Sequence, residues 1–147
     1  MTGITRFEDL VAWQRARILA RAIYAATRIE PFAGDRALAR QIQRAAVSVM
    51  ANIAEGFERG RPAEFHQYVS TAKASCAEVR LHLYLALDNG YLDERNFERL
   101  MGSAMEVSRI VGGLRVNLER EVESKKPRHS SHSVLSTQYS VPPDANH

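Results

Sequence analysis

Arginine is the residue type in this chain whose number and spacing most clearly suggest a chemical role. Two regular rows occur in the first half of the sequence, and their members are Arg17, Arg21 and Arg28, then Arg36, Arg40 and Arg44. On a helix that turns about 100° per residue, the residues of each row share one side. A guanidinium is permanently charged and offers a planar fork of donors that matches phosphate oxygens. Rows of this kind therefore suit the backbone of a nucleic acid.

The distribution of charge leaves two interpretations of these arginines open. Residues 1–62 hold ten arginines against six acids, whereas residues 63–124 hold seven basic residues against ten acids. The rows either contact nucleic acid, or they lie on a solvated face and pair with acidic groups of the same or a neighbouring chain. No zinc-finger spacing, helix-turn-helix signature or RNA-recognition aromatic pair accompanies the arginines. Any nucleic-acid contact is therefore expected to involve backbone or shape rather than base sequence.

Residue types that perform catalysis are present, but their spacing does not suit an active site. His66 and His82 lie sixteen residues apart and are expected off the core face of one helix. Cys76, the single cysteine, is expected to be a buried apolar residue with no base beside it. The chain has no phosphate-binding loop, no Gly-x-Ser-x-Gly turn and no His-Glu-x-x-His helix. We therefore predict a protein that is not an enzyme and that holds no metal and no cofactor.

Two stretches of small and polar residues stand where a helical bundle would usually place leucine. They cover residues 48–56 and 72–79, and the members of interest are Asn52, Glu55, Gly56, Ser75 and Glu78. We interpret Ser48, Asn52, Ser75 and the two glutamates as a buried hydrogen-bonded layer or as caps that fix the register of two helices. A metal or hydrolytic site built on Glu55 and Glu78 is the less favoured alternative, because the paired Glu-x-x-His pattern of carboxylate-bundle sites does not occur.

Prolines and glycines divide the chain into four segments with helical periodicity. The expected helices cover about residues 7–29, 35–57, 62–89 and 93–124. Thr5 and Glu8 predict a capping box for the first helix, and Gly56 is expected to end the second. Pro62 opens the third helix and Asp93 caps the fourth. The fold class is therefore all-α, an antiparallel up-down-up-down four-helix bundle over residues 1–124.

The two ends of the chain differ from this simple bundle pattern. The first segment is apolar on most of its circumference, which indicates either a helix deep in its own bundle or an oligomer interface. Residues 125–147 are rich in serine, contain Pro142 and Pro143 and have no helical period, so they are predicted to be a disordered tail. A single cysteine, the absence of a leader sequence and the absence of an apolar run of about 18 residues favour a cytoplasmic protein without a membrane span.

Several of these segments carry a family likeness. They are residues 7–14, 44–48, 72–78 and 89–92, together with the Asn-Ile-Ala-Glu-Gly element at residues 52–56. Over about residues 6–123 the chain resembles the four-helix-bundle proteins of the 23S rRNA-intervening-sequence family. The resemblance implies a bundle that assembles as a homopentamer, in a family most of whose members have no established biochemical function. The chain is also similar to the accessory variability proteins of diversity-generating retroelements, which implies binding of RNA or DNA alongside a reverse transcriptase.

The residues and the resemblance lead to one main prediction and one alternative. The main prediction is a non-enzymatic homo-oligomer, a pentamer by resemblance, that binds nucleic acid through the six arginines and is an accessory to another protein. The alternative is a protein-binding scaffold that makes no nucleic-acid contact and whose arginines satisfy acidic partners.

Overall fold

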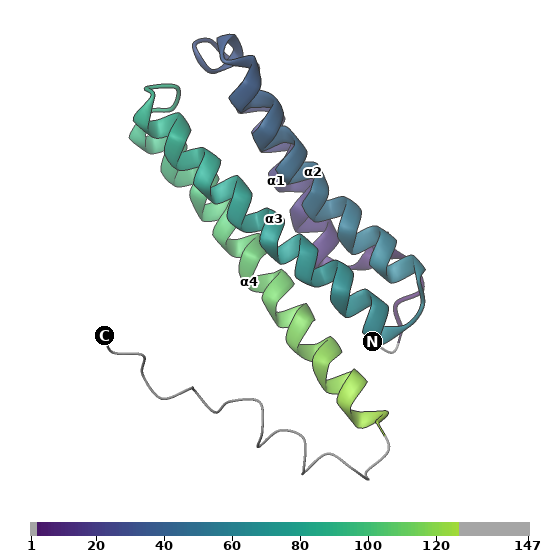
Figure 1. Ribbon diagram of the computed structural model, residues 1–147. Helices are drawn as coiled ribbons and strands as arrows, with labels where there is room; N and C mark the ends of the chain where they lie inside the picture. Colours follow the sequence, from purple (N-terminus) through teal and green to yellow (C-terminus); the bar gives the residue numbers. More distant parts are fainter. Residues whose placement is uncertain (1–2, 127–147) are drawn as a thin grey trace, which may run out of the picture.

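The predicted all-α four-helix bundle is confirmed by the computed structural model, which describes residues 3–126. The elements are the short 3-10 turns η1 (Phe7–Asp9) and η2 (Phe32–Gly34) and the helices α1 (Val11–Thr27), α2 (Arg36–Glu58), α3 (Pro62–Asp88) and α4 (Glu94–Ser124). Figure 1 shows the four helices alongside one another, with the end of α4 projecting beyond α3. Each helix packs against the next in the chain, and α1 also packs against α4. The predicted tail, except for Lys125 and Lys126, lies outside the described residues.

Local sequence signals explain where three of the helices begin. The carboxylate of Asp35 accepts a hydrogen bond from the backbone N–H of Leu38 at 3.1 Å and caps α2. Asp93 caps α4 in the same way, and the N–H of Asn96 lies 2.7 Å from its carboxylate. Pro62 occupies the first turn of α3, where its missing N–H has no helical partner to lose. The predicted starts at Pro62 and Asp93 are confirmed.

Two predicted helix boundaries are wrong. Residues 7–9 form a separate 3-10 turn and α1 begins at Val11 without a side-chain cap, so Thr5 and Glu8 do not form a capping box. The Glu8 carboxylate instead pairs with Arg6 at 2.9 Å. Gly56 does not end α2, which continues to Glu58, and Gly60, with φ of +76°, takes the left-handed conformation after it.

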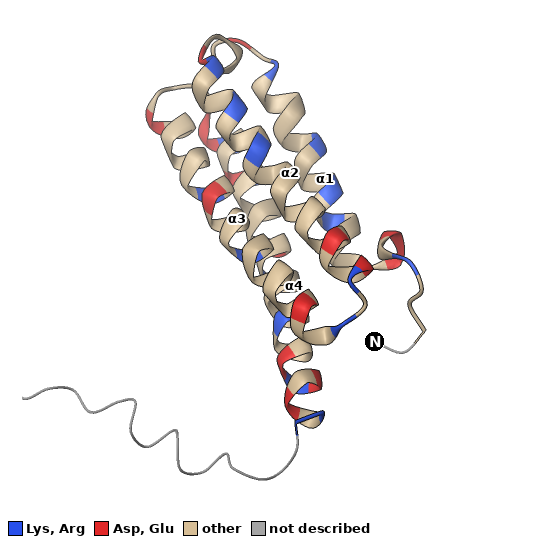
Figure 2. Cartoon of the chain, turned by 45° about the vertical axis from the view of Figure 1, so that its right-hand side comes forward, with Lys and Arg blue, Asp and Glu red and all other residues tan. Residues whose placement is uncertain are grey.

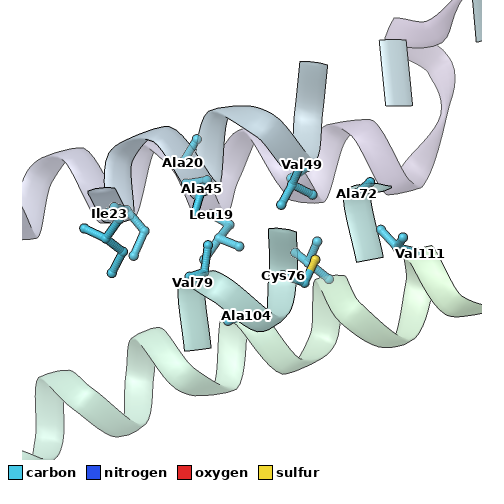
Figure 3. Packing of buried hydrophobic residues seen from close by; sticks show 14 of the residues in the cluster. Leu19, Ala20, Ile23, Ala45, Val49, Ala72, Cys76, Val79, Ala104 and Val111 are labelled. Carbon is cyan, nitrogen blue, oxygen red and sulfur yellow. The ribbon is translucent and has the colours of Figure 1, made fainter. Parts of the chain in front are cut away.

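The core of the bundle combines alanine and valine with larger leucine and isoleucine side chains from all four helices. Figure 3 shows Leu19, Ala20 and Ile23 of α1 with residues of α2, α3 and α4, and the labelled residues on these are Ala45, Val49, Ala72, Cys76, Val79, Ala104 and Val111. Alanine at facing positions brings helix axes close together, because the distance between helices depends on the side chains at the contact. None of the described helices is long and apolar enough to cross a membrane.

One end of the bundle is tied by a contact between its two connecting loops. The Tyr91 ring stacks on Phe32 with ring centroids 5.5 Å apart, and its hydroxyl donates to the Asp35 carboxylate at 2.9 Å. This hydrogen bond raises the pKa of Tyr91 above its ordinary value. The same Asp35 caps α2, so one carboxylate connects the start of α2 with the α3–α4 connection.

The other end depends on a close approach between α2 and α3 at Gly56. A Cβ atom at position 56 would lie 2.6 Å from the Cβ of Tyr68 and 2.8 Å from a ring carbon of Phe65. Both contacts are too short for carbon atoms, and neither group is the free end of a flexible side chain. The glycine is therefore required by packing and not by its backbone angles.

We expect Gly56→Ala to lower the free energy of unfolding by about 1–3 kcal/mol, because an added methyl group forces the two helices apart. Gly113→Ala in α4 is the matched control, since nothing lies within 4 Å of the methyl group it adds. The control should be neutral or stabilising by up to about 1 kcal/mol, because alanine favours helix over glycine. Denaturant unfolding followed by circular dichroism measures both, and equal effects at the two sites would contradict the packing role of Gly56.

Candidate nucleic-acid interface

The two arginine rows lie on neighbouring helices that a hydrogen bond connects. The side-chain amide of Gln43 on α2 donates to the hydroxyl of Thr27 at the end of α1, at 2.8 Å. The antiparallel arrangement therefore places Arg28 beside the row on α2 and carries Arg21 and Arg17 further down the bundle. At a rise of about 1.5 Å per residue, the combined rows extend over about 25 Å along the axis.

Acidic residues are nearly absent from this part of the surface. The helix α1 contains three arginines and no acid, and both acids of α2 lie in its last turn. In Figure 2 the basic bands follow one another along α1 and α2, while most acidic bands lie on α3, on α4 and at the ends of the bundle. The concentration of positive charge inferred from the sequence therefore corresponds to a continuous region of the fold.

The six arginines are exposed and make no ion pair within the described part of the chain. The ion pairs found among residues 3–126 involve other basic side chains, namely Arg6, Arg15, His66 and Arg115. Like charges at i, i+4 on a helix repel one another, so Arg36, Arg40 and Arg44 carry a repulsion that no described carboxylate relieves. Pairing with acids of the same chain does not account for the rows among these residues.

Arg17 of α1 and Arg28, which directly follows α1, lie over aromatic rings. The guanidinium carbon of Arg17 is 5.8 Å from the ring centroid of Trp13, and that of Arg28 is 5.9 Å from the ring centroid of Tyr24. Both pairs have i, i+4 spacing, which places two side chains together on a helix and is a signal visible in the sequence. Such cation–π contacts at exposed sites contribute about 0.5–1 kcal/mol each.

Part of the predicted polar layer is present between α2 and α3. The hydroxyls of Ser48 and Ser75 are 2.8 Å apart. The amide of Asn52 donates to the Ser48 carbonyl at 2.8 Å and to its hydroxyl at 3.0 Å. Ser75 is buried, and its hydrogen bond to Ser48 satisfies its hydroxyl there. These three residues connect the two helices through polar contacts.

The two glutamates do not belong to this layer, so that part of the interpretation is wrong. Glu55 and Glu78 are both exposed. Each follows a member of the layer by three residues, Asn52 or Ser75, which turns it by about 60° around its helix toward solvent. No described contact brings the two carboxylates together, and the arrangement does not resemble a two-carboxylate active site.

One of the two histidines of α3 lies off the core face as predicted, and the other does not. His82 is buried with 7% of its surface exposed, which corrects its predicted place off the core face, and its Nδ1 has no hydrogen-bond partner. His66 lies 3.0 Å from the Glu119 carboxylate on α4. The two therefore act as separate packing and surface residues.

Lys73 and Cys76 lie on the inner part of α3. The Lys73 ammonium donates to the carbonyl and the hydroxyl of Ser108 on α4, both at 3.0 Å, and Gly112 leaves room for it. Burial raises the pKa of Cys76 from 9.0 to about 11, although Lys73 and Arg80 act in the opposite direction. The thiol therefore stays protonated at neutral pH and is a poor nucleophile.

Comparison with known proteins identifies the family. A family model described as 23S rRNA-intervening sequence protein matches residues 8–113 of the chain. The chain belongs to this family. The match covers all of α1, α2 and α3 and most of α4. The expected family membership is thus confirmed, whereas nothing found supports a relation to retroelement accessory proteins.

Solved structures include a relative with the same fold. A protein with unknown function from the S23 ribosomal protein family of Bacteroides thetaiotaomicron is 19% identical, with a TM-score of 0.67. The alignment covers 72% of this chain and 96% of that protein. At this level of identity the likeness shows the fold alone. A search of the curated proteins found no match.

The protonated state of Cys76 leads to a prediction that can be tested with a thiol reagent. We expect no reaction with Ellman's reagent at pH 8 in the folded protein and complete reaction after unfolding in denaturant. Because the folded pKa is raised, the unfolded thiol ionises first, and stability should fall as the pH rises from about 9 toward 11. Cys76→Ala should remove this contribution to the pH dependence. Rapid labelling of the folded protein would contradict the proposed environment.

Proposed function

We propose that this member of the 23S rRNA-intervening sequence family is a non-enzymatic homo-oligomer that binds the backbone of nucleic acid through the arginine rows of α1 and α2. The observation that carries the proposal is the exposure of six arginines without an ion pair to the described residues, on two adjoining helices. A phosphate backbone supplies regularly spaced negative charge, and its binding releases condensed counterions.

Backbone binding suits this surface better than recognition of base sequence. The six exposed guanidiniums lie along two helices packed side by side and not on the projecting end of α4, whereas a recognition helix enters a groove. Contacts to phosphates position a protein on nucleic acid without reading the sequence. We therefore expect affinity that depends strongly on salt and weakly on sequence.

Exposed apolar residues on two separate parts of the bundle support the oligomer. On α1, Val11 and Ile18 are 56% and 50% exposed and lie about 60–120° around the helix from the arginines of the row. On α3, Leu81, Tyr84 and Leu85 are 49%, 53% and 45% exposed. Two different patches on one chain suit a head-to-tail contact, which closes into a ring when the rotation between successive copies permits it. The pentameric number rests on the family resemblance alone.

An oligomer would also strengthen binding through repetition of the rows. Every copy adds the same set of arginines, so a strand that spans two copies gains a second contact at high effective concentration.

An accessory role beside an enzyme that acts on nucleic acid, such as a reverse transcriptase, belongs to the same proposal, as does a cytoplasmic location.

The alternative proposal is a protein-binding scaffold without nucleic-acid contact. The α3 patch favours it, since Tyr84 also packs on Phe97 of α4 with ring centroids 5.3 Å apart and forms a firm apolar surface. Purification with a stoichiometric protein partner and without nucleic-acid absorbance would support the scaffold.

The triple variant Arg36→Ala, Arg40→Ala, Arg44→Ala tests the binding proposal. We expect the slope of log affinity against log salt to become shallower by about 2–3, since each lost phosphate contact removes about 0.7–0.9. Fluorescence anisotropy with a labelled RNA at several salt concentrations measures the slope.

The matched control for this variant is Arg95→Ala with Arg109→Ala, two exposed arginines of α4. The control should keep the wild-type slope. Absence of salt-sensitive association of the wild-type protein with RNA or DNA at low ionic strength would overturn the proposal.

The oligomer is tested by Ile18→Glu, which places a charge in the apolar patch of α1. We expect light scattering to show a several-fold lower mass than for the wild-type protein, because the desolvated charge weakens the contact. Val116→Glu is the control, as Val116 is 44% exposed on α4 outside both patches. A wild-type mass equal to that of one 16.5 kDa chain would refute the oligomer.

A further inference from the structure

The pairs Trp13–Arg17 and Tyr24–Arg28 distinguish this surface from a simple row of positive charge. Both pairs lie on the side of α1 that carries the arginine row, and their arginines are separated by about 16 Å along the helix. Arg21 lies between them and makes no ion pair with a described residue. Trp13 and Tyr24 are partly exposed. Trp13 also packs partly against the core and meets Phe7 edge to face, with ring centroids 5.1 Å apart. Each pair therefore presents a charge beside the part of an aromatic ring that remains exposed.

We infer that the nucleic acid bound by the arginine rows is single-stranded, with unpaired bases stacked at these two pairs and phosphates held by the remaining arginines. The inference rests on the proposed function and specifies its ligand. Unpaired bases stack on aromatic side chains and on guanidinium planes, and this stacking tolerates any base. It therefore agrees with a surface that has no elements for reading sequence.

Duplex nucleic acid would leave the two pairs unused. In a duplex the flat faces of the bases are stacked on one another, and the major groove of double-stranded RNA is too narrow for side chains to enter. Phosphates alone need only charge, which Arg21 and the α2 row provide without a cation–π contact to a described ring. The cation–π contacts also restrict Arg17 and Arg28 before binding, so less side-chain freedom is lost when a strand binds.

A third pair of the same kind shows what such a contact looks like in a structural role. The guanidinium carbon of Arg59 is 5.4 Å from the ring centroid of Tyr68, and Arg59 also donates to the Tyr68 hydroxyl at 2.8 Å. This pair joins the end of α2 to α3 and lies outside the arginine rows. A substitution of Arg59 therefore serves as a control, because it removes an arginine–aromatic contact outside the proposed binding site.

The test compares an unstructured RNA of about 16 nucleotides, a length that covers one typical single-strand site, with the same RNA annealed to its complement. Trp13 is the only tryptophan of the chain, so its fluorescence reports on one of the two pairs. We expect the single strand to quench this fluorescence and to bind at least about fivefold more tightly than the duplex, as stacking of a single base would produce.

The double variant Arg17→Lys, Arg28→Lys keeps the charge and removes the planar guanidinium. It should lower the affinity for the single strand at least about fivefold, with the affinity for the duplex and the salt slope nearly unchanged. Arg59→Lys should alter neither affinity. Both variants keep the core intact, and circular dichroism checks that they fold.

Two results separate this inference from the proposed function. Equal, salt-sensitive binding of single strand and duplex, without a change in Trp13 fluorescence or an effect of the lysine variant, would refute the single-strand site and leave backbone binding standing. Absence of binding to both forms at low salt would overturn the proposed function and the inference with it.

Discussion

The packing of α2 against α3 is the constraint on which the position of the charged surface depends. Gly56 lets the two helices approach so closely that any larger residue would meet Tyr68. One register of the pair satisfies both this contact and the Ser48–Ser75 hydrogen bond. An α-helix is a rigid element. The register that fixes position 56 near the end of α2 therefore also fixes the position of Arg36 at the start of the same helix.

The helix α1 joins this framework with three sides that have different chemistry. Leu19 and Ile23 enter the core, Ile18 faces solvent on one flank, and Arg21 faces solvent on another. The wide apolar coverage seen in the sequence therefore has two causes, burial in its own bundle and an exposed apolar flank.

The overall fold follows from the sequence because its signals are local and repeated. Pro62 and Asp93 identify helix starts from the chemistry of a single residue, and helical periodicity identifies the class of fold. Gly56 was misjudged because a glycine serves equally as a helix end and as a site of close packing, and only the neighbouring helix decides between them. The burial of His82 and the bond from Lys73 to Ser108 likewise depend on residues distant in sequence.

In the candidate site, too, contacts within one helix can be predicted from the sequence, whereas contacts between helices cannot. The alignment of each arginine row is a property of one helix and follows from spacing, whereas the junction of the two rows depends on two helices that Gln43 and Thr27 connect. The Trp13–Arg17 and Tyr24–Arg28 pairs were within reach of sequence reasoning, since i, i+4 spacing alone places them together. Their effect is to restrict the conformations of the two arginine side chains. A guanidinium that already contacts a ring is partly ordered before a ligand binds. Binding therefore costs less side-chain entropy, and more of the electrostatic attraction contributes to affinity.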